Sequence, residues 1–307
     1  MQSSLDPAGD DAGRLLDLAT ILFAGGTVIF LGTMALALAA LLLPASRRGW
    51  LSGRTFVVLA GVAFPTVTLT VLLGYALWAL RVTNVPRADP LVIEVSGEQY
   101  WWRVRYPAEG ERPEVVTANE IQVPAGRPVR VELTAADVIH SFWIPNFAGK
   151  VDMIPGRRNV MLFTPERTGV FRGVCTEFCG EQHARMAFDV VVLEPAAFEG
   201  WRDARARPAA APSTESARLG HELFRRNGCG SCHVVRGTEF GGALGPDLTH
   251  VGSRRTIGAG SYPNNAGTLG GWIADTQHLK SGARMPSYGS LSGTELRAVA
   301  GYLEALK

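Results

Sequence analysis

Residues 171–186, FRGVCTEFCGEQHARM, hold the densest group of metal-binding side chains in this 307-residue chain. Four of them offer sulfur or imidazole donors: Cys175, Cys179, His183 and Met186. A second histidine stands upstream, His140 in the stretch DVIHSFWIPNFAGKVDMIPGR at residues 137–157. Because sulfur ligands select copper, zinc or iron–sulfur centres and imidazole suits several metals, the two stretches predict a site for a soft metal.

The second cysteine of this group favours two metal ions. A mononuclear blue-copper site uses one cysteine with two histidines and a weak methionine, whereas Cys175 and Cys179 together can bridge two ions. Two alternatives stay open on ligand chemistry alone. The cysteines can form a disulfide, as extracytoplasmic domains permit, or a structural zinc site can use His140 and His183.

Both stretches resemble the CuA domain of subunit II of bacterial cytochrome c oxidases, which are haem–copper oxidases, and the likeness extends from about residue 15 to about residue 195. The resemblance implies a cupredoxin-like barrel with a dinuclear copper centre. The copper ligands that it implies are the following side chains and one backbone carbonyl: His140, Cys175, Cys179, His183, Met186 and the carbonyl of Glu177. In the family the carboxylate at the Glu177 position also binds magnesium at the junction with subunit I. The alternative for Glu177 is a solvated loop acid.

An aromatic stretch at residues 99–102 departs from the family pattern. The family usually has Gln-Trp-Tyr-Trp, whose first tryptophan admits the electron from cytochrome c. Here the stretch is Gln-Tyr-Trp-Trp, so Tyr100 holds the first aromatic position and Trp101 the second. These two residues are the candidates for the point where electrons enter, and a donor tethered to the same chain would explain the exchange.

Two apolar runs precede these motifs, at residues 15–43 and 55–80. Each exceeds the roughly 20 residues that cross a hydrocarbon core, and in lipid such a run forms a helix because only a helix satisfies its own backbone. Pro65 interrupts the second run and is expected to kink it. A cleaved signal peptide is the alternative for the first run, but this run is longer than a signal-peptide core and an acidic tail precedes it.

Three arginines in the loop between the runs predict its orientation: Arg47, Arg48 and Arg54. By the positive-inside rule this loop is cytoplasmic, which leaves both ends of the chain on the outer side. The sequence thus predicts a multi-pass protein of the bacterial inner membrane, anchored in the lipid bilayer, whose later domains lie in the periplasm.

Composition changes along the chain and predicts a multidomain membrane protein. Hydrophobic residues make up 47% of the chain, and the formal net charge of +2 is too small to indicate nucleic-acid binding. Short alternating stretches separated by turn residues predict an all-β domain, and helical spacing at residues 217–226, 271–279 and 294–306 predicts an all-α domain. The predicted division is an N-terminal tail (1–14), a two-helix transmembrane hairpin (15–81), an all-β cupredoxin-like CuA domain (90–195), a linker (196–215) and an all-α cytochrome c domain (216–307).

Cys229-Gly-Ser-Cys232-His233 is the attachment signature of a c-type haem. The two thiols form thioether links to the vinyl groups, and the histidine binds iron. The order of motifs over residues 216–307 resembles a class I cytochrome c, with Met285-Pro286 late in the domain. Met285 is therefore predicted to be the sixth iron ligand, which raises the potential. The alternative is a methionine that fills a gap in the core.

These features predict a subunit that admits electrons to a cytochrome c oxidase. Electrons would pass from a periplasmic donor, a cytochrome c or a quinol–cytochrome c reductase, through haem c to the copper pair. Subunit I, which associates with this chain among other oxidase subunits, would then reduce oxygen to water. Five basic residues of the last domain could steer an acidic partner: Arg225, Arg226, Arg254, Arg255 and Lys280. Two alternatives are the same role in a copper-containing nitric oxide reductase and a stand-alone membrane-tethered electron carrier.

Overall fold

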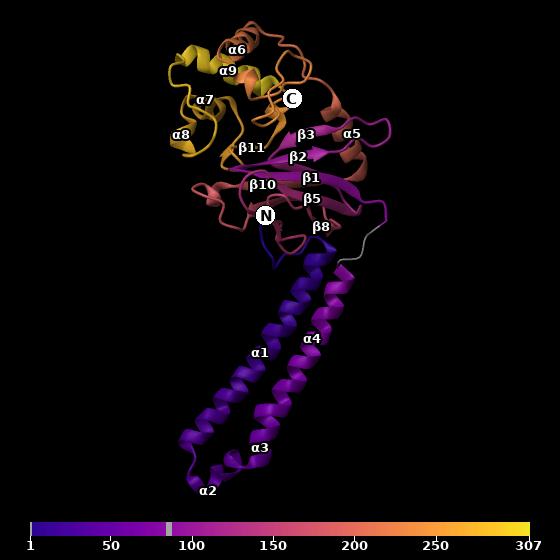
Figure 1. Ribbon diagram of the computed structural model, residues 1–307, viewed down its shortest axis with the longest axis vertical. Coiled ribbons are helices and arrows are strands. Elements are labelled where there is room, and N and C mark those ends of the chain that lie inside the picture. The colour runs from indigo at the N-terminus through magenta and orange to yellow at the C-terminus, as the bar shows by residue number, and fades with distance from the viewer. Residues whose placement is uncertain (1, 84–87) are drawn as a thin grey trace. The chain divides into compact units, whose positions relative to one another are not determined.

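The computed structural model of the chain describes residues 2–83 and 88–307 (Figure 1). It divides into two units, one formed by Met1–Ala12 with Ala88–Lys307 and the other by Gly13–Arg87. The helical elements that belong mainly to the second unit are α1 (Asp10–Leu42), α2 (Ala45–Arg48), the 3-10 turn η1 (Gly49–Ser52), α3 (Arg54–Val58), the π-helical turn η2 (Leu59–Ala63) and α4 (Phe64–Thr83).

The two long helical stretches have the length and composition of membrane spans. The 18-residue windows within Asp10–Leu42 and Arg54–Arg81 have mean hydropathies of 2.1 and 2.3, and the large apolar side chains of both helices are exposed. Threonine hydroxyls within them donate to the carbonyl one turn earlier, as Thr20 does to Leu16 at 2.8 Å, so these polar groups are satisfied without water.

The proline predicted to kink the second span lies just after an irregular turn. Pro65 has no N–H to give to the helix, and the five residues of η2 immediately before α4 form a π-helical turn. Such single π turns accommodate a break in the regular hydrogen-bond ladder.

The domain that follows is a sandwich of two five-stranded sheets. The first sheet has the order β3 (Val115–Ala118), β2 (Trp101–Tyr106), β1 (Leu91–Glu98), β5 (Val129–Ala135), β8 (Asn159–Phe163). The second has the order β4 (Glu120–Pro124), β10 (Ala187–Leu193), β9 (Gly169–Cys175), β6 (His140–Trp143), β7 (Val151–Met153).

Strict alternation along the strands builds the core of this sandwich. Along β1, Leu91, Ile93 and Val95 are buried and the residues between them are half-buried, which is the period-two pattern of a strand with one face inward. Phe142 of β6 and Phe188 of β10, both in the second sheet, stack with ring centroids 4.5 Å apart, and Trp102 of the first sheet packs edge-on against both. The core therefore lies directly beneath the strand ends that carry the predicted metal-binding residues.

The first residues of the chain pack on this sandwich. The Ala8 amide donates to the carbonyl of Asn146 at 2.8 Å, and Asp6 forms an ion pair with Arg167 at 2.9 Å. This contact could not be predicted from composition or periodicity, because it joins residues that are far apart along the chain.

The first half of the predicted linker is a helix, α5 (Pro195–Ala206). Phe198 is fully buried against the sandwich and Trp201 packs beside it. Arg202, whose charge argued against burial, is only 2% exposed because its guanidinium donates to Glu109 at 2.5 Å and to the carbonyl of Pro107 at 3.0 Å. The predicted linker thus begins with a helix that packs on the sandwich, and the charge of Arg202 can be buried there because it is paired.

The C-terminal domain is mainly helical, as predicted. Its elements are α6 (Glu215–Arg226), the 3-10 turns η4 (Cys229–Ser231) and η5 (Val251–Ser253), the two-stranded ribbon β11 (Thr256–Ile257) and β12 (Tyr262–Pro263), α7 (Ala266–Ala274), α8 (Thr276–Leu279) and α9 (Gly293–Ala305). Helices α6 and α9 approach closely at Gly220, where a Cβ would lie 2.1 Å from the carbonyl oxygen of Ala298. Membrane-type helices, a β sandwich and a helical domain together confirm the predicted multidomain fold class.

Candidate metal and haem sites

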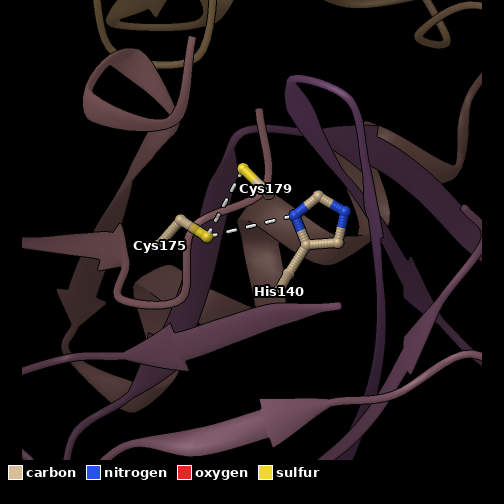
Figure 2. A group of neighbouring side chains, drawn as sticks. All are labelled: His140, Cys175 and Cys179. Carbon is tan, nitrogen blue, oxygen red and sulfur yellow. Dashed lines mark hydrogen bonds between the residues drawn. The ribbon is translucent and has the colours of Figure 1, made fainter. Parts of the chain in front are cut away.

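Strand pairing brings the two metal-binding stretches together. His140 begins β6 and Cys175 ends β9, and these strands pair with Phe142 opposite Cys175. The loop after Cys175 then folds back over the strand ends. Figure 2 shows the His140 ring and the Cys175 and Cys179 thiols pointing toward one another, and their donor atoms all lie within 4.8 Å.

All six predicted donors converge on this point. Four contacts complete the group: His140 Nδ1 to Cys175 Sγ at 3.9 Å, His183 Nδ1 to Cys179 Sγ at 3.7 Å, Met186 Sδ to Cys179 Sγ at 3.8 Å and the Glu177 carbonyl to Cys175 Sγ at 3.2 Å. The Cys175 and Cys179 sulfurs are 3.9 Å apart, far beyond the disulfide bond length of about 2.05 Å. Both can reach a shared ion, because metal–sulfur bonds are about 2.3 Å long.

The thiol pair favours a bound cation. The contact with the adjacent Cys179 sulfur lowers the pKa of Cys175, and the same contact raises the pKa of Cys179. Two thiolates this close repel each other, so the second proton leaves only when positive charge replaces it. A buried pair of sulfurs with imidazole and thioether neighbours therefore fits soft metal ions.

His140 is held in one orientation. Its Nε2 lies 2.9 Å from Asp137 Oδ1, which leaves Nδ1 facing the sulfurs. Its ring also lies against Gly97 of β1, where a Cβ would come within 2.9 Å of it. Burial lowers the pKa of His140, but the contacts with Cys175 and Asp137 outweigh this and raise it. Sequence reasoning missed the roles of Asp137 and Gly97, although Asp137 stands three residues before His140 in the quoted stretch.

Apolar side chains surround the metal-binding loops on the outside. Three large ones are exposed there: Val138 at 38%, Ile139 at 45% and Phe178 at 75%. Phe178 is the residue between Glu177 and Cys179, and its ring lies 5.9 Å from that of His183. An exposed apolar group beside a buried polar site is typical of a surface that another protein covers.

The haem-attachment residues line a cavity of about 300 Å³. Cys229, Cys232, His233 and Met285 all face it, although Met285 stands more than fifty residues after the other three. Most of the remaining wall is apolar and comes from the helical domain, including Phe224 and Leu303. This wall fits a large flat apolar group attached through the two thiols.

His233 has one ring nitrogen occupied by the protein. Its Nδ1 lies 2.8 Å from the carbonyl oxygen of Pro246, so Nδ1 carries the proton and Nε2 is left as the ligand atom. The ring packs closely on Gly245, where an added Cβ would lie 2.5 Å from it, so this position accommodates only glycine. Burial lowers the pKa of His233 and keeps the imidazole neutral, as iron ligation requires.

The aromatic stretch at residues 99–102 touches both sites. Gln99, Tyr100 and Trp101 line the haem cavity from the β domain. The Tyr100 hydroxyl accepts a hydrogen bond from the Glu181 amide at 3.1 Å, and the Gln99 side chain donates to the Cys179 carbonyl at 2.6 Å. The candidate residues for electron transfer thus lie between the haem cavity and the metal-binding loop.

One predicted surface residue is in the interior. Lys280 was grouped with residues that could steer an acidic partner, but its side chain is only 2% exposed and it lines the haem cavity. A single lysine in a polar loop carries no sign of burial in its sequence, because the burial depends on contact between two domains.

Comparison with known proteins matches two families, one along each of the two later domains. Residues 94–193 match the family model described as cytochrome C oxidase subunit II, periplasmic domain, and residues 217–307 match the cytochrome c model. The chain is 37% identical to cytochrome c oxidase subunit 2 of Alkalihalophilus pseudofirmus, over 82% of this chain and 70% of that protein. It is 32% identical to the protein of the same name from Bacillus sp. (strain PS3), over 82% of this chain and 71% of that protein. The solved periplasmic domain of subunit II of cytochrome oxidase from Bradyrhizobium japonicum is 36% identical, covers 39% of this chain and 96% of that chain, and has a TM-score of 0.37.

Proposed function

Because this chain belongs to the cytochrome c oxidase subunit 2 family and carries a cytochrome c domain, we propose that it admits electrons to a haem–copper oxidase. Electrons would come from a periplasmic donor, a cytochrome c or a quinol–cytochrome c reductase, to haem c, to the CuA copper pair and then to subunit I. Oxygen would be reduced to water in subunit I. The observation that supports this order is that one compact unit holds both the soft donor cluster and the haem cavity.

The copper ligands would be the six convergent donors: the side chains of His140, Cys175, Cys179, His183 and Met186 and the carbonyl of Glu177. When bound, two coppers sharing two thiolates supply a one-electron carrier whose geometry changes little on reduction. The chain's contribution is to bury these donors at the end of a rigid sandwich and to hold His140 on Asp137.

In the helical domain, Cys229 and Cys232 would attach the haem, with His233 Nε2 and the Met285 sulfur as its axial ligands. Methionine ligation raises the potential of such a haem, which suits a respiratory carrier. Tyr100 and Trp101 would provide the aromatic contact through which electrons reach the copper site, since both line the cavity and Tyr100 touches the copper loop.

Glu177 would in addition bind magnesium with subunit I through its half-buried carboxylate, next to the exposed apolar group of Val138, Ile139 and Phe178. Oxidase subunit I would cover that group, as expected for a family whose members work with other oxidase subunits.

The chain would cross the bacterial inner membrane twice. The N-terminal residues pack on the sandwich, and the sandwich follows the second apolar helix, so the chain is on the same side before and after the hairpin. With Arg47, Arg48 and Arg54 in the cytoplasmic loop, both termini would be periplasmic. The proposed division stays at 1–14, 15–81, 90–195, 196–215 and 216–307, with α5 occupying the first half of the linker.

Purification of the native complex from membranes tests this function against its two alternatives. We expect the chain to co-purify with a large haem-bearing subunit in a complex that consumes oxygen with a reduced cytochrome c. A complex that reduces nitric oxide in preference to oxygen would assign the chain to a nitric oxide reductase. A chain that purifies with both cofactors and without any such subunit would be a stand-alone carrier.

A further inference from the structure

The residues just before Met285 connect the haem cavity to both copper-site loops. This segment, Leu279–Arg284, ends α8 and leads directly to the predicted sixth iron ligand. Its backbone and side chains meet the copper loop at residues 181–185, and its last residue, Arg284, donates to Asp137 at 3.2 Å. One short segment of the haem domain is thus in contact with both of the stretches that hold the copper donors.

Lys280 is at the centre of this contact. Its ammonium donates to three backbone carbonyls: those of Tyr100 at 2.9 Å, Arg185 at 2.8 Å and Gly258 at 2.8 Å. Tyr100 lines the haem cavity, Arg185 directly precedes Met186, and Gly258 belongs to the turn of the haem-domain ribbon. A single charged group therefore joins the two domains, beside the haem cavity on one side and next to the copper loop on the other.

The chemistry of this contact marks it as a specific one. A lysine ammonium has three N–H donors, and all three are used inside a protein environment where the side chain is 2% exposed. Burying an ammonium is costly unless each donor finds a partner. The acceptors come from three separate chain stretches, so the donors are matched only when the two domains hold this one arrangement.

Further hydrogen bonds between the two domains surround Lys280. Arg185 donates to the Leu279 carbonyl at 2.8 Å and Gln182 donates to the Ser281 hydroxyl at 3.0 Å, while Ser281 donates to Glu181. The Glu181 and Arg185 side chains are exposed, so water can replace their contacts more easily than those of Lys280, whereas Gln182 is 9% exposed. The buried ammonium has no such replacement.

We propose that Lys280 is a positioning residue for electron transfer within this chain: it fixes Leu279–Arg284 on the copper loops and so sets the separation of the haem and copper sites. This inference rests on the proposed function. The step is a one-electron transfer, in which the haem iron is oxidised from ferrous to ferric and the copper pair is reduced by one electron. Lys280 exchanges neither an electron nor a proton in it. Its effect comes from distance, because electron-transfer rates fall exponentially as the gap between the two sites widens.

The test uses the full chain with both cofactors in detergent, and Lys280→Met as the variant. Methionine keeps much of the length of the side chain and removes all three donors. A flash-activated ruthenium reductant reduces the haem, and the transfer to copper is followed in the haem and copper absorption bands. Lys150→Met is the matched control, since Lys150 is 55% exposed and its one ion pair, with Asp152, is 3.8 Å long.

We expect Lys280→Met to slow the transfer by roughly tenfold or more, as misplacement of reacting groups on the ångström scale does in other systems. The loss of rate should exceed what any shift in the two reduction potentials explains, and amide hydrogen exchange should rise in residues 279–284. The Lys150→Met chain should transfer electrons at the unsubstituted rate. A Lys280→Met chain with an unchanged rate would overturn the proposal, as would a slower rate that is fully explained by a shifted potential.

A second measurement needs no variant, and it decides the question if Lys280→Met does not fold. In the unsubstituted chain a fixed arrangement makes the transfer rate independent of solvent viscosity, whereas a haem domain that moves on its linker slows as glycerol is added. A viscosity-dependent rate therefore contradicts the proposal. An unsubstituted chain that holds both cofactors and shows no transfer at all would instead overturn the proposed function, and the inference with it.

Discussion

Two of the three histidines proposed to bind metal, His140 and His233, are held in the same way but on opposite ring nitrogens. His140 is held at Nε2 by the Asp137 carboxylate and offers Nδ1 to the copper donors. His233 is held at Nδ1 by the carbonyl of Pro246 and leaves Nε2 for iron. Each ring lies close to a glycine, His140 to Gly97 and His233 to Gly245, and a Cβ added at either glycine would collide with the ring. The comparison shows that the hydrogen bond, and not the histidine, selects the ligating atom.

The two groups that orient these histidines, the Pro246 carbonyl and the Asp137 carboxylate, differ in charge and in the other contacts that they make. The Pro246 carbonyl is neutral and belongs to the haem domain itself. Asp137 is a carboxylate that also accepts hydrogen bonds from the Gln99 amide and from Arg284 of the haem domain. The copper site is therefore sensitive to the contact between the domains, while the proximal side of the haem is built locally.

The largest predicted effect comes from removing a donor from one site only. In Cys179→Ser the second bridging sulfur is lost, so the mixed-valence signal of the copper pair should disappear while haem attachment remains. Electron paramagnetic resonance and the haem absorption spectrum of the same sample measure both. A copper pair signal that persists in Cys179→Ser would refute the bridging role.

A smaller effect is expected from replacing Asp137, the carboxylate that orients His140. Asp137→Asn keeps the shape of the side chain and removes its charge, and loss of such a partner typically costs about 10–100-fold in metal affinity. Competition with a copper chelator measures this affinity, and the haem potential serves as the internal control. Equal copper affinity in the two chains would mean that the hydrogen bond from Asp137 does not orient the ligand.

The corresponding change on the haem side is Met285→Ala. It removes the sixth ligand from the cavity and should lower the haem potential, since methionine ligation raises it. The copper spectrum should not change, because the copper donors lie in the other domain. A redox titration of the haem decides the result, and an unaltered potential would make Met285 a core residue.

The smallest effect should lie outside both sites. Glu109→Gln leaves the buried Arg202 without its charged partner and should lower the free energy of unfolding of the β domain by about 1–2 kcal/mol. The hydrogen bond from Arg202 lowers the pKa of Glu109 below its ordinary 4.5, so its stabilisation is present above that pH and is lost as the pH falls through the lowered value.

Denaturant unfolding of the two chains at several pH values measures this effect. The difference between them should be constant near neutrality and should vanish in acid. Copper and haem spectra of Glu109→Gln should match those of the unsubstituted chain. A stability difference that grows in acid would contradict the assignment.

The sequence predicts donor side chains that the structure brings together at both sites, but it does not predict the residues that orient them. Cys175, Cys179, His183 and Met186 are close in the chain, so their spacing alone predicts a cluster. Gly97 reaches His140 only through the packing of one sheet on the other, which spacing does not contain. The fold class followed from hydropathy and alternation, because these patterns report burial directly.

The errors of sequence reasoning concern charged residues. Arg202 and Lys280 were interpreted as parts of a linker and of a basic surface, yet both are 2% exposed. Each is buried because its donors meet carbonyl or carboxylate acceptors from distant parts of the chain. The composition of a segment cannot reveal such partners, since they exist only after folding.

The contact between Asp6 and Arg167 has a consequence for synthesis of the protein. The two residues are 161 positions apart, and ribosomes add about 5–20 residues per second, so Asp6 waits roughly 10–30 s for its partner to be made. During that interval the segment around Asp6 has no sandwich surface to bind. Completion of the β sandwich then captures this segment, so residues near position 6 take their place only after residues near position 167 have been made.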